Sequence, residues 1–384
     1  MVYRTGLDLF IAEQYELVKA KRVGLVTNHT GLDRNFQSNI DLFQRHPEIK
    51  LVALYGPEHG VRGNVQAGVK VGHNIDQYTG LPVYSLYGRE KKPTAEILAG
   101  IDVLIFDIQD IGLRFYTYLS TLLYCLESCA ENELDLIVLD RLNPLGRRVE
   151  GNLVSPAYQS FIGLYPIPQR HGMTAGELAR WANQQFELGT RLEVVELEGW
   201  QGEYFDHLDL QWIPPSPNIP QFKTALLYPV TCLFEGTNIS EGRGTANPFE
   251  YIGAPWIDPY LLSDYLAERE LPGVKLRPVF FVPTFSKHKD KECGGVQLLL
   301  ENRDEVDSFL TGLTILQAIF ELYPVESNWL IPANQQHKYF FDLLMGSDQV
   351  RIGLAEGRAV ADIIDSWRRE REDFIANSRK YILY

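Results

Sequence analysis

Almost continuous hydrophobic runs alternate with amphipathic segments through the first half of the chain. The four strongest runs occupy residues 23–27, 51–55, 101–106 and 134–139. Uninterrupted runs of this kind are typical of parallel strands that are buried on both faces. The segments between them have helical periodicity and predict helices at about residues 35–45, 94–99 and 116–132. Strands that alternate with helices predict an α/β fold with a doubly wound sheet.

The second half begins with a predicted helix and strand, which are followed by a proline-rich segment and then by a mixture of strands and helices. Thr174 and Glu177 have the spacing of a capping box, which predicts a helix to about Phe186, followed by a strand at residues 192–197. The segment IPPSPNIP that follows, residues 213–220, is too rich in proline for a helix interior or a central strand. It is either a domain boundary or a rigid loop that presents Asn218. Beyond it, the pattern predicts strands at residues 276–282 and 295–300 and helices at about residues 306–322 and 359–377. This mixture indicates a smaller α+β domain after the proline-rich segment.

Composition and charge exclude several classes of protein. The 384 residues are 45% hydrophobic and 22% charged, as in folded globular proteins. A net charge of −14 disfavours nucleic acid and anionic membrane surfaces as partners. No apolar run is long enough for a membrane span. Cys125 and Cys129 lie in an apolar helical segment, so we expect buried thiols. No leader is evident, so we expect a cytoplasmic protein, or a periplasmic or secreted one if a leader has been removed.

Familiar cofactor and hydrolase motifs are missing from the sequence. There is no G-x-G-x-x-G after the first run, no phosphate-binding loop, no G-x-S-x-G elbow and no H-E-x-x-H. The eight histidines are scattered, although His29, His59 and His171 could still meet in space. We therefore predict an activity that needs no metal and no cofactor.

Polar side chains follow each of the four predicted strands. They include Asn28 and His29 after the first, Glu58, His59 and Arg62 after the second, Asp107, Gln109, Asp110 and Arg114 after the third, and Arg141 after the fourth. Because ligands of open α/β sheets bind outside the carboxyl ends of the strands, these residues predict a ligand site. The alternative is that each one forms a turn or caps a helix.

Glu58 is the clearest candidate for chemistry. Glutamate is not a favoured turn residue, yet Glu58 lies between Pro57 and Gly60 directly after an apolar strand. Partial burial at such a position favours the protonated carboxyl group that a general acid requires. The alternative is an exposed glutamate, or one that pairs with Arg62 or His59.

A second polar cluster follows the proline-rich segment. It contains Glu235, Asn238, Glu241 and Arg243 within a stretch that also holds three glycines. Glycine permits close backbone approach and unusual dihedral angles, so this loop predicts ligand contacts. A flexible surface loop is the alternative.

The chain resembles the NamZ-type exo-β-N-acetylmuramidases in a series of ordered motifs. These are GLVTNHTG (24–31), YGPEHG (55–60), FDIQDIGLRFYTY (106–118), DRLNPLG (140–146), PSPNIP (215–220) and LFEGTNISEGRGT (233–245). The resemblance covers nearly the whole chain. It implies a Rossmann-like catalytic domain at residues 1–222, a smaller α+β domain at residues 223–384 that completes the cleft, and release of N-acetylmuramic acid from the non-reducing ends of peptidoglycan fragments.

Glycoside cleavage needs an acid and usually a second group, and the sequence leaves the second group open. Glu58 is the expected acid, and Asp107, Asp110, Glu235 and Glu241 are the candidates for its partner. Carboxyl groups about 5–5.5 Å apart would indicate retention, and about 6.5–9.5 Å inversion. In a third route, the acetamido group of the substrate attacks the anomeric carbon, and a polar group orients it.

Substrate contacts are expected from the same motifs. A guanidinium is the natural partner of the lactyl carboxylate, with Arg243 or Arg62 favoured over Arg114 and Arg141. Asn28, Gln109, Asn218 and Asn238 suit hydroxyl groups and the acetamide, His29 and His59 are further contacts, and Tyr116 could offer a ring or a hydroxyl group. The partner is then a muropeptide or another peptidoglycan-derived glycan. A muropeptide-binding protein without catalysis, and a hydrolase of another acidic amino sugar, are the alternatives.

Overall fold

The computed structural model describes residues 2–63, 74–88, 90–332 and 338–384. These residues form two compact units that the chain enters more than once. Unit 1 comprises residues 1–148, 172–217 and 377–384, and unit 2 comprises residues 149–171 and 218–376. The sequence-based division between residues 222 and 223 stays a prediction.

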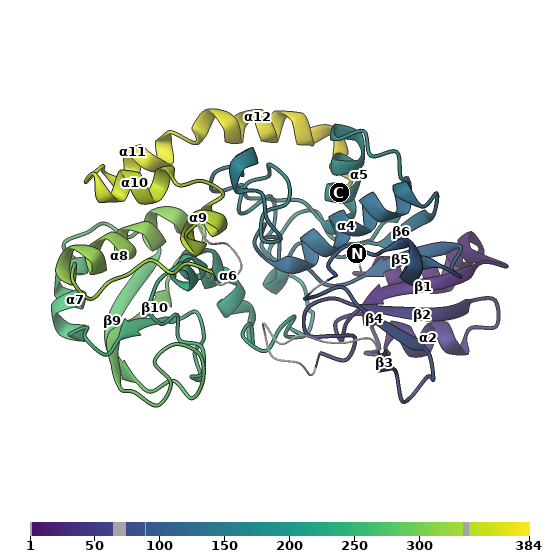
Figure 1. Cartoon of the computed structure of the whole chain (residues 1–384), viewed down its shortest axis with the longest axis horizontal. Helices are drawn as coiled ribbons and strands as arrows, with labels where there is room; N and C mark the ends of the chain where they lie inside the picture. Colours follow the sequence, from purple (N-terminus) through teal and green to yellow (C-terminus); the bar gives the residue numbers. More distant parts are fainter. Residues whose placement is uncertain (1, 64–73, 89, 333–337) are drawn as a thin grey trace. The chain divides into compact units, whose positions relative to one another are not determined.

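A seven-stranded sheet organises unit 1. Its strands are β1 (Arg22–Thr27), β2 (Lys50–Gly56), β3 (Asn74–Ile75), β4 (Pro82–Ser85), β5 (Val103–Asp107), β6 (Asp135–Leu139) and β7 (Arg191–Val195). They lie in the order β3-β4-β2-β1-β5-β6-β7, and all neighbours are parallel except β3 and β4. This is the doubly wound α/β sheet that the hydrophobic pattern predicts (Figure 1).

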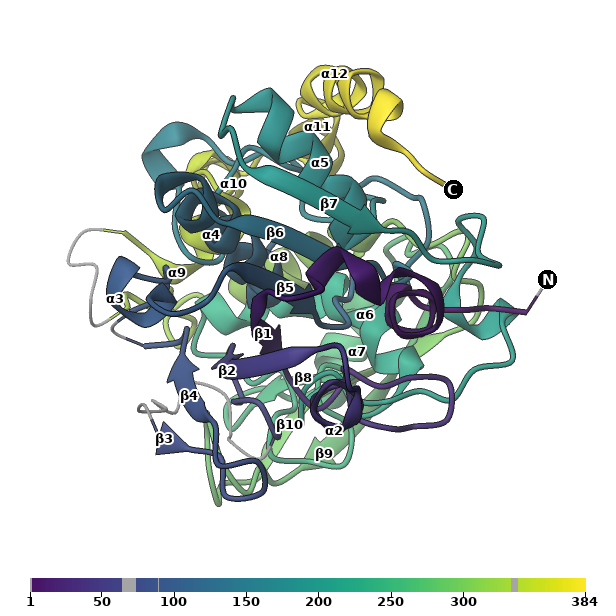
Figure 2. The ribbon, with the colours of Figure 1, turned by 90° about the vertical axis from the view of Figure 1, so that its right-hand side faces the viewer.

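Helices cover both faces of this sheet. They are α1 (Gly6–Leu9), α2 (Asn39–Arg45), α3 (Ala95–Leu98), α4 (Thr117–Glu131) and α5 (Ala175–Gln185). Figure 2 shows α4 and α5 on one face and α1 and α2 on the other. The capping box that opens α5 is present, because Thr174 Oγ1 accepts from the Glu177 N–H and the Glu177 carboxylate accepts from the Thr174 N–H.

Several local features of unit 1 differ from the sequence prediction, and two of them have a clear physical reason. The helix expected from residue 35 begins only at Asn39, because the Asp33 carboxylate accepts from the backbone N–H groups of Asn35 and Gln37 and holds a turn there. Strand β4 was not predicted, since its four residues include a proline and only every second one is buried.

The strand order reverses direction between β1 and β5, and this point positions the candidate site. The chain runs outward from β1 through β2 to β4, and then returns to β5 on the other side of β1. Thr27 and Asp107 are paired at the carboxyl ends of β1 and β5. The loops that leave these two strands therefore diverge and open a crevice, where ligands of open α/β sheets bind.

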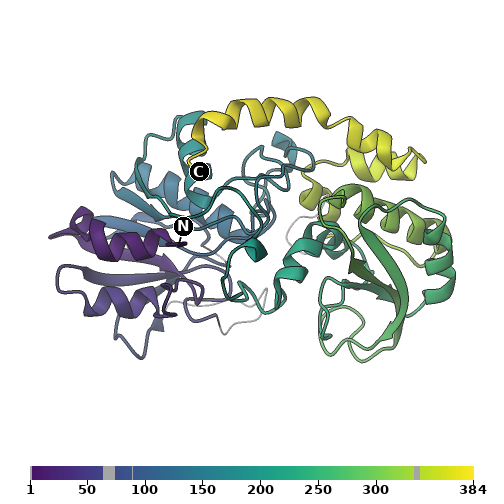
Figure 3. The ribbon, with the colours of Figure 1, turned by 180° about the vertical axis from the view of Figure 1, so that it is seen from behind.

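Unit 2 is built on a three-stranded antiparallel sheet in the order β8-β10-β9. Its strands are β8 (Tyr251–Ala254), β9 (Val274–Phe281) and β10 (Cys293–Leu300). Its helices are α6 (Phe222–Thr231), α7 (Pro259–Ala267), α8 (Ser308–Leu322), α9 (Phe340–Met345), α10 (Gln349–Ala355), α11 (Val360–Asp365) and α12 (Arg368–Ser378), whose last two residues belong to unit 1. Helices α6, α7 and α8 pack with this sheet around one apolar core (Figure 3).

The single helix predicted at residues 359–377 is two helices, α11 and α12. The chain breaks at Ser366 and Trp367, where the Ser366 hydroxyl donates to the Ile363 carbonyl. Trp367 is buried in the core of unit 2 beside Phe309. Burial of this indole fixes the turn, so tertiary packing overrides the helical periodicity. No helix in the described part of the chain has the length and apolarity that a membrane crossing needs.

Candidate functional site

Glu58 lies at the corner of a tight turn after β2. The Gly60 N–H donates to the Pro57 carbonyl at 3.0 Å, so residues 57–60 form a β-turn. His59 occupies its third position with a φ of +73°, a left-handed conformation that costs free energy for any residue but glycine. The Thr117 hydroxyl, at the start of α4, donates to Glu58 Oε2 at 2.9 Å. The carboxyl group is therefore half-buried and held at a strained turn.

Three ionisable side chains lie within electrostatic range of Glu58. Burial raises the pKa of Tyr116 and of Tyr118, and the Glu58 charge raises both further. Burial lowers the pKa of Lys91, and Glu58 opposes that shift. Asp110 also raises the pKa of Tyr116, so this phenol lies within electrostatic range of two carboxyl groups. We group Glu58, Asp110 and Tyr116 as one electrostatic cluster, because both carboxyl groups act on the same phenol.

The proline-rich segment borders this cluster. The Tyr118 hydroxyl donates to the Pro215 carbonyl at 2.7 Å, and His29 Nε2 lies 2.7 Å from the Pro214 carbonyl. A Cβ atom at residue 63 would lie 2.1 Å from His29 Nδ1, so Gly63 lets the ring pack closely. Burial lowers the pKa of His29, and the neighbouring His59 lowers it too. Through its contact with the Pro214 carbonyl, His29 anchors the loop.

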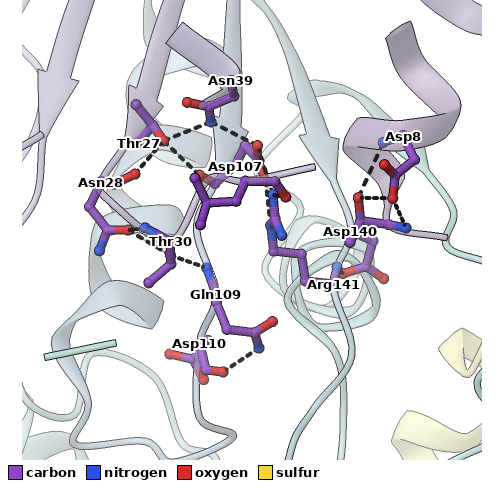
Figure 4. A network of polar contacts seen from close by, with 12 residues as sticks. Asp8, Thr27, Asn28, Thr30, Asn39, Asp107, Gln109, Asp110, Asp140 and Arg141 are labelled. Carbon is purple, nitrogen blue, oxygen red and sulfur yellow. Dashed lines mark hydrogen bonds and ion pairs between the residues drawn. The ribbon is translucent and has the colours of Figure 1, made fainter. Parts of the chain in front are cut away.

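Asn28, Thr30 and Gln109 join the ends of β1 and β5. Asn28 Oδ1 accepts from the Thr30 N–H at 2.9 Å and from the Thr30 hydroxyl at 2.6 Å. Thr30 Oγ1 in turn accepts from the Gln109 N–H at 2.9 Å, and Gln109 Nε2 donates to the carbonyls of Asp110 and Leu142. Figure 4 shows this network between the two strands. It fixes the backbone that carries Asn28 and Asp110.

Asp107 is enclosed in an ion pair. Arg141 Nε lies 2.6 Å from Asp107 Oδ1, and Arg141 Nη2 lies 3.1 Å from Asp107 Oδ2. Asn39 Nδ2 also donates to Asp107 Oδ2, at 2.7 Å (Figure 4). Asp107 is 0% exposed and Arg141 is 6% exposed. Both side chains were predicted as site residues. They bind each other in a buried ion pair at the ends of the strands.

Asp110 has one satisfied oxygen and one that makes no hydrogen bond. The Gly112 N–H donates to Asp110 Oδ1 at 2.6 Å. Asp110 Oδ2 is buried and has no hydrogen-bond partner among the described residues. Burial raises the pKa of Asp110 from its usual 3.8 to about 7. Near pH 7, both the protonated and the ionised form of the Asp110 carboxyl group are therefore populated.

The raised pKa of Asp110 predicts a pH-dependent stability. The folded state binds this proton more tightly than the unfolded state, so the free energy of unfolding falls as the pH rises from about 4 to about 7. We expect Asp110→Asn to stabilise the protein by about 2–4 kcal/mol at pH 8 and by much less at pH 4. Urea unfolding at both pH values measures the difference. Asp209→Asn, at an exposed position of unit 1, is the control. A gain in the free energy of unfolding that does not change with pH would contradict the raised pKa of Asp110.

Two of the predicted arginines in unit 1 have different surroundings. Arg62 pairs with Asp76 through two bonds, Nε to Oδ1 at 3.1 Å and Nη2 to Oδ2 at 2.9 Å. A cavity of about 330 Å³ lies beside this pair, lined also by Gly60 and Tyr78. Arg114 is 1% exposed, and burial lowers its pKa to about 9.

The predicted cluster of unit 2 forms its own ion-pair network. Glu241 is 2% exposed and lies 2.7 Å from Lys287 Nζ and 3.4 Å from Arg243 Nε. Burial would raise the pKa of Glu241, but Lys287 and Arg243 outweigh it and lower that pKa. Arg243 also pairs with Glu235 at 2.8 Å, and Lys287 donates to the carbonyls of Phe234, Thr237 and Ile239. This loop is therefore ordered by internal charge pairs.

The remaining predicted residues of unit 2 contact backbone or lie buried. Asn238 Nδ2 donates to the Glu326 carbonyl at 2.8 Å, and its Oδ1 accepts from the Asn328 N–H at 2.9 Å. Asn218 is buried at the start of this part of the unit. His171 is buried as well, and burial lowers its pKa to about 3. Within the described ranges, no three His, Cys, Asp or Glu side chains are arranged to hold a metal.

Sequence reasoning missed several side chains that complete these clusters, among them Lys91, Thr117 and Lys287. Lys91 begins a Lys-Lys pair that looks like a solvated surface, and Thr117 looks like an ordinary first residue of a helix. Lys287 is far along the chain from the loop that it holds. Only Thr117 carries a usable signal, since it lies in the motif FDIQDIGLRFYTY beside two tyrosines.

Comparison with known proteins gives concordant matches along the chain. The family model for the N-terminal part of exo-beta-N-acetylmuramidase NamZ matches residues 23–223, and the model for its C-terminal part matches residues 226–384. The peptidoglycan beta-N-acetylmuramidase NamZ of Bacillus subtilis (strain 168) is 45% identical over 383 residues, which are 99% of this chain and 91% of that protein.

Solved structures give the same result. Two crystal structures of DUF1343 family proteins from Bacteroides fragilis NCTC 9343 each cover 100% of this chain, and the match covers 99% of each of those chains. One is 39% identical with a TM-score of 0.91, and the other is 31% identical with a TM-score of 0.75. The resemblance in the sequence motifs is thereby confirmed, and this chain belongs to the exo-β-N-acetylmuramidase NamZ family.

Proposed function

We propose that this protein is an exo-acting glycoside hydrolase that releases N-acetylmuramic acid from the non-reducing ends of peptidoglycan fragments during cell-wall turnover or recycling. The observation that carries the proposal is Glu58, a half-buried carboxyl group on a strained turn at the carboxyl edge of the sheet, in a chain of this family. A relative that is 45% identical is a peptidoglycan beta-N-acetylmuramidase. No cofactor enters the proposal.

Glu58 is the proton donor of the proposed reaction. Of its four candidate partners, Asp107 is bound to Arg141, Glu241 to Lys287, and Glu235 to Arg243. A carboxylate that pairs closely with a cation is stabilised in its charged form and has few lone pairs left for a substrate. Asp110 remains, with one oxygen that makes no hydrogen bond to a described residue. We therefore assign Asp110 as the second catalytic group.

The lactyl carboxylate of the substrate needs a cation near the cluster. Arg62, Arg141 and Arg243 each contact a carboxylate within 3 Å. This argues against the two favoured arginines, Arg243 and Arg62, as the receptor. Lys91 is half-buried and close enough to Glu58 for their charges to interact, which supports Lys91 as the lactyl contact.

The substrate class can be tested with two chromogenic sugars. We expect the purified protein to release the chromophore from a β-N-acetylmuramide and to be at least about 100-fold slower on the matching β-N-acetylglucosaminide, because the latter lacks the lactyl carboxylate. Initial rates at several concentrations give kcat/KM for each. Equal rates would indicate a different amino-sugar hydrolase. Binding of muropeptides without release from either sugar would indicate a non-catalytic binding protein.

A further inference from the structure

The choice among the three routes of glycoside cleavage depends on what the polar groups beside Glu58 can bind. Asn28 and Asp110 each present one polar atom that makes no hydrogen bond with a described residue. In Asn28 this atom is the donor Nδ2, and in Asp110 it is the acceptor Oδ2. Both atoms are buried, so each carries a desolvation cost that a bound ligand would offset.

The identity of the Asn28 donor is fixed by its neighbours. The Thr30 N–H can only donate, and it points at Asn28 Oδ1 at 2.9 Å. The amide oxygen must therefore face Thr30, and the amide nitrogen must face the opposite way. Asn28 is 2% exposed, so this side chain cannot reorient without loss of that bond.

The Asn28 donor and the Asp110 acceptor lie on loops that hydrogen bonds join at the ends of β1 and β5. Asn28 follows Thr27 on β1, Asp110 lies three residues past Asp107 on β5, and Thr27 and Asp107 are register partners. Thr30 Oγ1 bonds the Gln109 N–H between them, as Figure 4 shows. The Asn28 side chain lowers the pKa of Tyr118, Asp110 raises that of Tyr116, and Glu58 raises both. The pair therefore shares its two tyrosine neighbours with the proposed acid.

An amide group has the matching polarity, since it offers one carbonyl acceptor and one N–H donor. Resting on the proposed function, we infer that Asn28 Nδ2 and Asp110 Oδ2 bind the 2-acetamido group of N-acetylmuramic acid, and that this acetamide is the nucleophile of the reaction. Asp110 accepts the acetamide N–H, and Asn28 donates to the carbonyl oxygen and orients it toward the anomeric carbon.

The resulting steps balance in atoms and charge. The acetamide oxygen forms a bond to the anomeric carbon while the glycosidic C–O bond breaks, and Glu58 gives its proton to the departing oxygen. The positive charge on the cyclised acetamide is stabilised by the Asp110 carboxylate. Water then attacks the anomeric carbon, Glu58 takes up its proton, and the acetamide is restored. The sugar leaves with retained configuration, and no second carboxylate bonds to it.

The test uses wild-type protein and a series of chromogenic β-muramides whose N-acyl group carries zero to three fluorine atoms. Fluorine withdraws electrons from the carbonyl oxygen, so we expect kcat to fall by at least about 100-fold across the series. We expect Asp110→Asn and Asn28→Asp, which keep the size of each side chain, to lower kcat on the acetyl substrate by about 10²–10³-fold. Asn28→Asp keeps the oxygen that faces Thr30. The control is Asp209→Asn, which should match wild type.

The outcomes separate this inference from the proposed function. A steep fall with fluorination, together with slow variants, supports the acetamide as the nucleophile. Normal turnover of the acetyl substrate with no dependence on fluorination would overturn the inference and leave the muramidase assignment in place. Absence of turnover of the acetyl muramide by wild-type protein would overturn both.

Discussion

Replacement of Glu58 by glutamine is expected to lower the release of N-acetylmuramic acid by about 10²–10⁴-fold, the usual contribution of a general acid. Glutamine has the same shape and can still accept the hydrogen bond from Thr117, so the fold and substrate binding should persist. The loss should be smallest for an aglycone that leaves readily without protonation. Steady-state kinetics with a phenol of low pKa and one of high pKa as leaving groups measure this difference.

The control for this variant is Glu96→Gln, which changes an exposed glutamate on α3 of the same unit. It should retain wild-type kinetics with both leaving groups. If Glu58→Gln lost activity equally on both aglycones, Glu58 would act in binding rather than as the proton donor. Unchanged turnover would remove Glu58 from the mechanism altogether.

Replacement of Asp107 by asparagine is expected to destabilise the protein by about 3–5 kcal/mol, because Arg141 would remain buried without its counter-charge. The pair is joined at 2.6 Å and 3.1 Å, and both side chains are almost fully buried. A double replacement by apolar residues of similar volume, Asp107→Leu with Arg141→Met, should recover much of this loss. Urea unfolding of the two single variants and of the double variant measures the coupling.

This experiment also separates a structural role of Asp107 from a catalytic one. A variant with wild-type stability but no turnover would make Asp107 a catalytic group and contradict its assignment to the ion pair. Arg22 and Asp102 form a matched exposed pair on the same sheet. Asp102→Asn should cost far less than Asp107→Asn, as is usual for a surface ion pair.

The architecture of unit 1 followed from local signals in the sequence. Strands β1, β2, β5 and β6 are nearly continuous apolar runs, and buried parallel strands need that composition whatever packs around them. The capping box at Thr174 predicted the start of α5 for the same kind of reason, because its two hydrogen bonds close within four residues. The short strands β4 and β8 were not predicted, because four residues are too few to show a clear alternation of hydrophobic and polar positions.

The sequence also placed polar side chains at the ends of the strands, but it could not say which of them were available to a substrate. Asp107 and Asp110 are three residues apart and chemically alike. Asp107 meets Arg141, which lies just after the neighbouring strand β6, whereas Asp110 has one oxygen that makes no hydrogen bond to a described residue. That difference comes from strand register and loop geometry, which a local sequence pattern does not predict.

What the sequence by itself determined was the parallel α/β sheet, the edge at which chemistry-bearing residues gather, and Glu58 as the leading candidate among them. These follow from periodicity and from residue type, which act over a few neighbours. What only the tertiary structure decided was the pairing of charges: Asp107 with Arg141, Glu241 with Lys287, and Arg62 with Asp76. Ion pairs join residues that lie far apart in the chain, and burial sets their strength, so they exist only once the strands and loops are in place.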